Sequence, residues 1–128
     1  MIALDGSVMI AYSYSKDPHH ESARKILLER ADEEFVAHSM TIAETLVGAV
    51  RAGRESELLS LLDVVGIHAA PSDEQEPLRL ARLRVRTGLK LRDCCALSAA
   101  VVTRSTLATF DSRLAEAARS LGLAVAGG

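Results

Sequence analysis

The sequence predicts a single α/β domain, with a mainly parallel central sheet of four to five strands and helices on both faces. Short apolar runs alternate along the whole chain with segments of helical periodicity, and parallel strands need crossover connections, which such helices supply. The chain has 128 residues, 48% hydrophobic and 25% charged, which is the size and composition of one globular domain. We therefore expect residues 1–128 to form one domain.

Local signals place three strands and four helices in the first half of the chain. Asp5 and Gly6 end the first apolar run, and a brief helix follows. Asp17 has the position of a helix N-cap before Pro18, and Thr41 opens a helix after the second strand. The expected strands are 2–4, 35–37 and 64–68, and the expected helices are 7–12, 17–30, 41–53 and 55–62.

The second half is expected to continue the alternation. Ser72 and Gln75 have the spacing of a capping box, which predicts a helix that ends near Gly88. Asp111 begins the last helix and Gly122 ends it. The expected helices are 72–88, 91–102 and 112–121, and the expected strands are 106–110 and 123–125.

Charge and composition restrict the classes of function. The net charge is -2, so affinity for a nucleic acid must come from local basic patches or bound cations. Aromatic residues make up 3% and Trp is absent, which argues against a platform for stacked bases. No apolar run is long enough for a membrane span and the start does not resemble a signal peptide. Cys94 and Cys95 are neighbours in an expected helix, unsuited to a disulfide, so we expect small core residues in a cytoplasmic protein.

Four acidic residues are candidates for a common site. Asp5 and Asp111 each follow an expected strand, and ligands of open α/β sheets bind beyond the carboxyl ends of the strands. Glu44 lies in the first turns of the helix after the second strand, which starts at the same edge. Asp93 is an acid within an otherwise apolar run, where an unpaired carboxylate is costly. We expect these four side chains to converge.

Each acid also has an ordinary structural explanation. Asp5 could make an Asx-turn, and Asp111 could be only a helix N-cap. Glu44 completes a capping box with Thr41. Asp93 could pair with a neighbouring basic residue. Taken singly, none of the four acids distinguishes a functional site from local structure.

Convergence of four carboxylates favours a divalent cation. Like charges at one sheet edge would raise one another's pKa unless a positive charge lay between them. Oxygen ligands without Cys or His favour Mg²⁺ or Mn²⁺ over zinc. Such an ion can lower the pKa of an attacking water and stabilise a leaving oxygen, which suits hydrolysis of a phosphodiester.

Four segments resemble, in order, the acidic motifs of PIN-domain ribonucleases. They are L-D-G-S at 4–7, A-E-T-L at 43–46, L-K-L-R-D-C-C-A-L-S-A-A at 89–100 and T-F-D-S-R-L at 109–114. D-P-H-H-E-S-A at 17–23 also resembles the start of the second helix in VapC-type toxins of VapBC type II toxin-antitoxin systems. The resemblance spans nearly the whole chain.

The resemblance implies a fold, a chemistry and partners. It implies a PIN-like domain that cuts single-stranded or loop regions of RNA with Mg²⁺ or Mn²⁺. Ser7 and Thr109 match hydroxyl positions that support the acids in the family. A homodimer and a VapB-type antitoxin that blocks the site are the implied partners. The implied metal ligands are Asp5, Glu44, Asp93 and Asp111.

A basic stretch lies before and at the third motif. Its members are Arg79, Arg82, Arg84, Arg86, Lys90 and Arg92. Residues 79, 82 and 86 fall on one helical face, so RNA phosphates could bind there, with Arg82, Arg86 and Arg92 as candidates. The alternative is an ordinary solvated helix face. The lone His38 is assigned no chemistry.

Two other functions remain open at this point. A phosphohydrolase could use Asp5 as nucleophile, but that chemistry normally needs a second Asp two residues later, where this chain has Ser7. A catalytically silent PIN-like module could bind a metal or a partner through the same acids. A short overlapping upstream reading frame, with a DNA-binding start and a basic tail, would favour the toxin.

Overall fold

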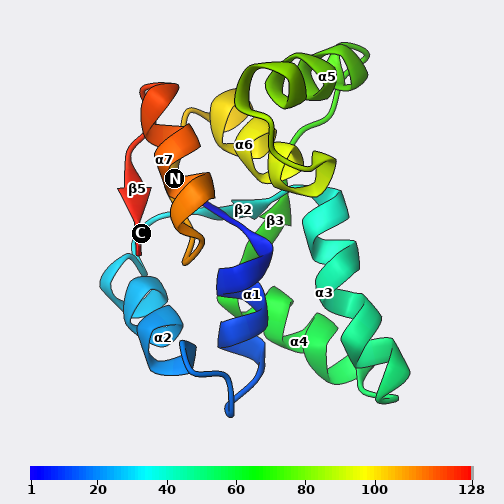
Figure 1. Cartoon of the computed structure of the whole chain (residues 1–128). Helices are drawn as coiled ribbons and strands as arrows, with labels where there is room; N and C mark the ends of the chain where they lie inside the picture. The colour runs from blue at the N-terminus through cyan, green and yellow to red at the C-terminus, as the bar shows by residue number, and fades with distance from the viewer. Residues whose placement is uncertain (128) are drawn as a thin grey trace.

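The computed structural model describes residues 1–127 and contains one five-stranded sheet in which every pair of neighbours is parallel (Figure 1). The strand order is β3-β2-β1-β4-β5. The strands are β1 (Ile2–Leu4), β2 (Phe35–Ala37), β3 (Ile67–Ala69), β4 (Thr106–Ala108) and β5 (Val125–Ala126). The helices are α1 (Gly6–Ser13), α2 (His20–Glu29), α3 (Ser39–Arg51), α4 (Glu55–Val65), α5 (Glu76–Thr87), α6 (Leu91–Thr103) and α7 (Ser112–Ser120). No helix within residues 1–127 has the length and apolar character to cross a membrane.

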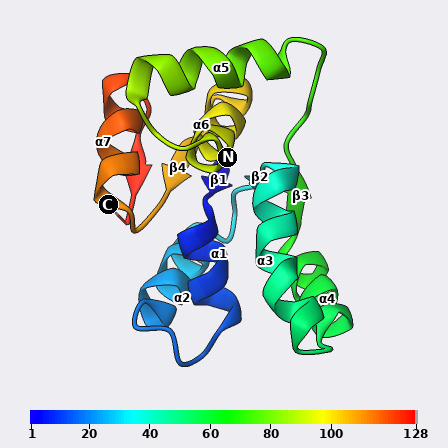
Figure 2. The same ribbon diagram turned by 45° about the vertical axis from the view of Figure 1, so that its right-hand side comes forward.

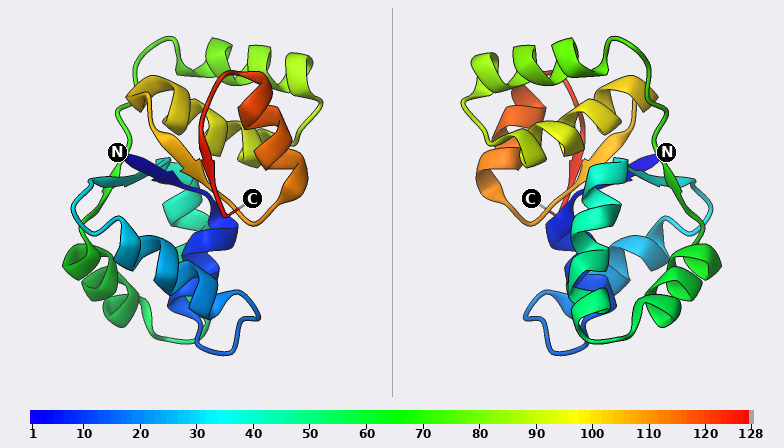
Figure 3. Two further views of the ribbon diagram at one scale, coloured as in Figure 1. Left: turned by 90° about the vertical axis from the view of Figure 1, so that its left-hand side faces the viewer. Right: turned by 90° about the vertical axis from the view of Figure 1, so that its right-hand side faces the viewer.

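Helices cover both faces of the sheet, as the alternation of elements predicts. Helices α1 to α4 lie on one side and α5 to α7 on the other (Figures 2 and 3). This arrangement follows from the crossovers, because each parallel connection must leave the sheet and return over one of its faces. The predicted α/β architecture with a parallel sheet is confirmed.

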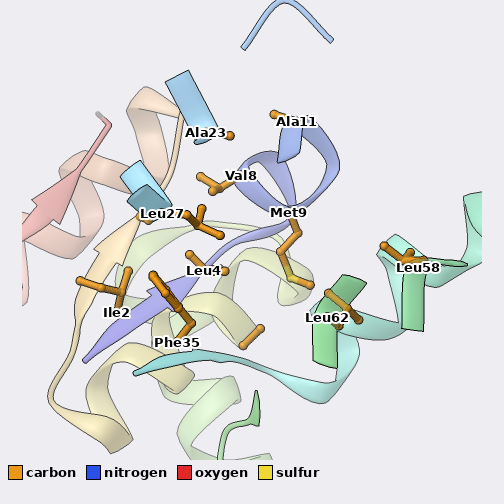
Figure 4. Packing of buried hydrophobic residues seen from close by; sticks show 12 residues of the cluster. Ile2, Leu4, Val8, Met9, Ala11, Ala23, Leu27, Phe35, Leu58 and Leu62 are labelled. Carbon is orange, nitrogen blue, oxygen red and sulfur yellow. The ribbon is translucent and has the colours of Figure 1, made fainter. Parts of the chain in front are cut away.

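Alternate strand side chains divide the core between the two faces. Ile2, Leu4 and Phe35 pack against α1, α2 and α4 (Figure 4). Ala3 and Val36 point the other way, into the cluster formed with α5, α6 and α7. Strands β1 and β2 are buried on both faces, which explains why each is a short continuous apolar run in the sequence.

The order of strands reverses beside β1. The chain places β2 and β3 on one side of β1, and then returns to place β4 on the other side. At such a reversal the following loops leave in opposite directions and open a crevice beyond the carboxyl ends of the strands, where α/β proteins bind ligands. The crevice predicted by this topology lies between the ends of β1 and β4.

Helices α2 and α5 begin later than the sequence predicts, and α1 and α3 begin one and two residues earlier. Helix α2 begins at His20 because Asp17 closes a turn, in which its Oδ1 accepts the His19 N–H at 2.8 Å. Helix α5 begins at Glu76 rather than at residue 72. Asp73 Oδ1 accepts the Gln75 N–H at 2.9 Å, so the predicted capping box is replaced by a turn.

Boundaries near three strands also differ. Helix α4 runs through Val65 to a left-handed Gly66, so β3 is 67–69 and not 64–68. Strand β4 ends at Ala108, because the next residues turn to form the site. Strand β5 is 125–126 instead of 123–125. The apolar character of these segments is correctly predicted, but apolar character alone does not separate the last turn of a helix from a strand.

Candidate metal and active site

The carboxyl ends of β1 and β4 bring residues more than 100 positions apart into contact. Leu4 pairs with Ala108 in the sheet, and the N–H of Asp5 donates to the Ala108 carbonyl at 3.1 Å. The next residues on each strand, Asp5 and Thr109, therefore lie side by side. Asp111 follows two positions later, at the start of α7.

Asp5 is buried, with 4% of its surface exposed, and both carboxylate oxygens accept hydrogen bonds. Oδ1 accepts from Ser7 Oγ at 2.7 Å and from the Val8 N–H at 3.0 Å, and Oδ2 accepts from Thr109 Oγ1 at 2.5 Å. Asp5 therefore has a structural role, because it is the N-cap of α1. A carboxylate offers about four acceptor positions, so about one remains for a ligand.

The hydroxyls of Ser7 and Thr109 donate to Asp5, and each also accepts a backbone N–H. Ser7 Oγ accepts the Phe110 N–H at 3.0 Å, and Thr109 Oγ1 accepts the Asp111 N–H at 3.0 Å. The two hydroxyls therefore connect the turn after β1 to the turn after β4. This geometry is consistent with the supporting role that the sequence suggested for them.

Asp111 acts electrostatically on two of the other acids. Burial raises the pKa of Asp5 above its usual value, and the charge of Asp111 raises it further. Burial and Asp111 likewise raise the pKa of Asp93, in the first turn of α6, against the opposing effect of Arg92 and other nearby cations. Asp111 itself caps α7, where its Oδ1 accepts two backbone N–H groups. Three of the four acids thus form one electrostatic group, with Asp111 acting on both Asp5 and Asp93.

Glu44 lies apart from that group in this structure. It is exposed on α3, and its Oε2 pairs with Nη1 of Arg92 on α6 at 3.8 Å. Its predicted capping box with Thr41 is wrong, because Thr41 lies inside α3 and His38 caps the helix instead. Arg92 therefore forms an ion pair with Glu44, while its charge also lowers the pKa of Asp93.

The fit of these acids to a metal ion depends on how closely they are gathered and on the ligands that the ion prefers. Within residues 1–127, no three His, Cys, Asp or Glu side chains are gathered so closely that they could enclose one. Mg²⁺, however, usually keeps several waters and takes one or two protein carboxylates directly. The available donors are carboxylate oxygens, and the environment of Asp5 and Asp93 disfavours their charged forms unless a cation is bound. The site fits a hydrated Mg²⁺ or Mn²⁺ better than a fully enclosed ion.

A family model for the PIN domain matches residues 2–120. The chain belongs to the PIN domain family. The comparison with curated proteins gave no match. The matched segment includes all four candidate acids.

Three solved structures share the fold over most of their length. VapBC2 from Rickettsia felis, bound to a DNA fragment from their promoter, is 19% identical, with 98% of each chain covered and a TM-score of 0.70. FitAcB from Neisseria gonorrhoeae is 21% identical, with 98% of this chain and 96% of that chain covered and a TM-score of 0.71. PAE2754 from Pyrobaculum aerophilum is 20% identical, with coverages of 98% and 83% and a TM-score of 0.61. At these identities the likeness shows the fold.

The arginines of α5 differ in whether they are already paired with acids of the protein. Arg79 forms ion pairs with Glu76 and Asp73, so it does not present a free charge. Arg82 and Arg86 are exposed and border a hollow of about 360 Å³ along α5. They therefore remain candidates for RNA phosphates.

The two cysteines are free and buried in α6, as predicted. Burial raises the pKa of Cys95 to about 11, and the negative charges of Glu76 and Glu44 add to that effect. A thiol with so high a pKa is almost wholly protonated at neutral pH and is a poor nucleophile. Cys95 is a core residue next to two carboxylates.

A buried polar cluster around Glu76 escaped the sequence analysis. Glu76 is 7% exposed and contacts His38 of α3's N-cap and Ser98 of α6. The local sequence gave no signal for it, because a Glu before Pro77 is typical of an ordinary first helical turn. Only the packing of α5 on α6 reveals the cluster.

Proposed function

We propose that this PIN domain is a metal-dependent endoribonuclease that serves as the toxin of a type II toxin-antitoxin pair. PIN domains are generally nucleases, so family membership supports phosphodiester hydrolysis. One observation carries the proposal furthest. Burial and the charge of Asp111 both raise the pKa of Asp5 and of Asp93 beyond the carboxyl ends of β1 and β4, and a divalent cation there would stabilise the charged carboxylates.

The proposed roles of the acids follow from their environments. Asp5, Asp93 and Asp111 would hold the cation directly, and Glu44 would hold it or one of its waters once released from Arg92. When bound, the cation supplies a lowered pKa for the attacking water and charge stabilisation for the leaving oxygen. Ser7 and Thr109 keep Asp5 oriented through their hydrogen bonds to its two oxygens.

The proposed reaction is an in-line hydrolysis of RNA. The water oxygen forms a bond to phosphorus as the bond from phosphorus to the 3′ oxygen breaks. The attacking water loses a proton and the departing 3′ oxygen gains one. The products are a 5′-phosphate and a 3′-hydroxyl. The exposed Arg82, Arg86 and Arg92 would bind flanking phosphates.

The toxin role and its partners rest on analogy. VapBC2 and FitAcB share the fold, and the motifs resemble those of VapC-type toxins. We accordingly propose a VapB-type antitoxin, a homodimeric toxin and a cytoplasmic location. A short reading frame that overlaps the gene upstream would support this, and its product should copurify with the PIN domain and suppress RNA cleavage.

The first experiment is cleavage of a mixed cellular RNA pool by purified protein with Mg²⁺, with Mn²⁺ and with EDTA. Asp93→Asn, made in parallel, changes the side chain's charge with little change in size. We expect discrete fragments with either metal, none with EDTA, and at least a hundredfold loss of rate in the variant, in the range seen for loss of a key electrostatic group. Asp93→Asn protein that cuts at the wild-type rate would sink the assignment.

The same experiment tests the other functions. Folded, metal-loaded wild-type protein that leaves all RNA intact would favour a catalytically silent binding module. The phosphohydrolase reading is weakened by the structure, since the Ser7 hydroxyl that occupies the general-acid position donates to Asp5 and accepts the Phe110 N–H. A serine held in this way cannot replace the second Asp of that chemistry.

A further inference from the structure

Glu76 makes hydrogen bonds to two other structural elements and to its own helix. Its Oε1 accepts from Ser98 Oγ of α6 at 2.8 Å and lies 3.0 Å from His38 Nε2. Its Oε2 accepts from Arg79 one turn along α5. A buried carboxylate is costly unless hydrogen bonds and charges compensate it, and these partners do so. Burial alone would raise the pKa of Glu76, but the hydrogen bonds outweigh it and keep that pKa below its usual range.

His38 transmits this contact to the start of α3. Its Nδ1 accepts the Met40 N–H at 3.1 Å, which makes His38 the N-cap of α3. Because Nδ1 accepts, Nε2 carries the proton and donates it to Glu76. One histidine ring thus joins the first turn of α3 to the first turn of α5. Glu44 lies on α3 about one and a half turns further along.

Ser98 makes the corresponding connection to α6. It is fully buried, and it lies five residues after Asp93 on the same helix. Helix α6, which carries both Asp93 and Ser98, packs against α3 as well as against α5. The cluster of Glu76, His38, Ser98 and Arg79 is therefore next to the helix segments that carry Glu44 and Asp93.

We propose that Glu76 is a positioning residue that holds α3 and α6 in register, and so sets the separation of Glu44 and Asp93 on which metal binding depends. This inference rests on the proposed function, because it takes those two acids as metal ligands. Sites of this kind need their ligands held within about 0.5 Å, which requires a rigid support behind them. Glu76 itself touches neither the metal nor the substrate.

The test measures Mn²⁺ binding to the full chain by calorimetry, which reports the dissociation constant and the number of sites separately. Glu76→Gln removes the charge that Arg79 and His38 contact. We expect its Mn²⁺ affinity to fall by about tenfold or more, the usual effect of losing a partner behind a metal ligand. Glu29→Gln on α2, whose side chain is 63% exposed, is the matched control and should bind as the wild type does.

Ser98→Ala is the decisive variant, because it removes one hydrogen bond from α6 to Glu76 and leaves every charge in place. We expect a loss of Mn²⁺ affinity of about threefold or more with one site still present per folded chain. A merely structural role would lower the number of folded sites and leave their dissociation constant unchanged. Ser98→Ala protein with the wild-type dissociation constant overturns the positioning role, whether or not Glu76→Gln folds.

The wild-type titration separates this inference from the proposed function. Wild-type protein that binds no Mn²⁺ would overturn both. Wild-type protein that binds Mn²⁺, together with an unchanged Ser98→Ala variant, would overturn only the role of Glu76. Weaker binding in Glu76→Gln with unchanged binding in Ser98→Ala would assign the effect to charge, and so would also exclude the positioning role.

Discussion

Asp5 combines a capping role with a candidate catalytic one in a single side chain. Its Oδ1 caps α1, while its burial and the charge of Asp111 raise its pKa. Capping alone does not account for that unfavourable environment, because an N-cap works equally well at an exposed position. A residue whose charge is disfavoured in the free protein fits a site prepared for a cation.

Asp5→Asn should therefore stabilise the metal-free protein. Asn and Asp are nearly equal as N-caps, so a purely capping residue predicts little change or a slight loss from the helix dipole. We expect an increase in the free energy of unfolding of about 1 kcal/mol in EDTA at pH 7, typical of relieving strain at a functional site. Thermal and chemical unfolding measure it, and Asp17→Asn in the turn before α2 is the matched control. Unchanged or reduced stability in Asp5→Asn would count against the metal-site assignment.

The stability that Asp5→Asn is expected to add should depend on pH in a definite direction. The folded state raises the pKa of Asp5, so ionisation opposes folding at neutral pH. The penalty is full above the raised folded pKa, shrinks as the pH falls through it, and vanishes below the ordinary value of 3.8. The stability difference between Asp5→Asn and the wild type should follow the same course when unfolding is measured between pH 7 and pH 3.5.

At the scale of elements, glycine determines where α4 stops and β3 begins. Gly66 has φ +81, a left-handed conformation that side chains with a Cβ disfavour, and its N–H satisfies carbonyls of the last helical turn. The apolar pair Val64 and Val65 therefore belongs to the helix, although its composition suggested a strand. A backbone conformation, not hydrophobicity, decided this boundary.

Gly66→Ala should lower the free energy of unfolding by about 1 kcal/mol, the cost of a left-handed residue with a Cβ. Gly48, exposed inside α3 with nothing within 4 Å of an added Cβ, is the matched control. Gly48→Ala should raise the same quantity by up to about 1 kcal/mol. Denaturant unfolding of both variants measures these changes. A Gly66→Ala protein as stable as the wild type would contradict the assignment of Gly66 as the cap of α4.

At the scale of the whole molecule, a protein with net charge -2 must attract RNA through a local surface. Arg79 is engaged by Glu76 and Asp73, which leaves Arg82 and Arg86 exposed on the outer face of α5. Helix α5 ends at Gly88, and α6 begins three residues later with Arg92 and Asp93 in its first turn. The turn at Gly88 thus connects the helix that carries the two arginines to the helix that carries Asp93.

Replacing both Arg82 and Arg86 by Ala should raise the KM for RNA several-fold and leave kcat nearly unchanged. Each lost phosphate contact should reduce the slope of log affinity against log salt by about 0.7 for single-stranded RNA. Arg51→Ala, which removes one exposed arginine at the C-terminal end of α3, is the control for the loss of surface positive charge away from α5. Unchanged KM and salt dependence in the double variant would assign these residues to an ordinary solvated face.

Local information in the sequence was sufficient for the number and type of elements and for which acids follow the strands. Apolar runs, helical periodicity and turn residues act over a few neighbours, so they predicted the parallel α/β fold and placed Asp5 and Asp111 at strand ends. The same information misplaced the starts of α2 and α5 and the range of β3, where a side-chain turn or a left-handed glycine decides the boundary. Motif resemblance then pointed to the PIN domain family that the family match confirmed.

Only the tertiary structure decided which residues meet. The strand order places β4 beside β1 although about 100 residues separate them, and that pairing creates the contact from Thr109 to Asp5. The packing of α5 across α3 and α6 buries Glu76 among partners from both. Non-local pairings depend on how the whole chain buries its apolar surface, whereas periodicity describes only each segment by itself. The gathering of acids at one sheet edge was therefore predictable, whereas the ion pair of Glu44 with Arg92 and the buried contacts of Glu76 were not.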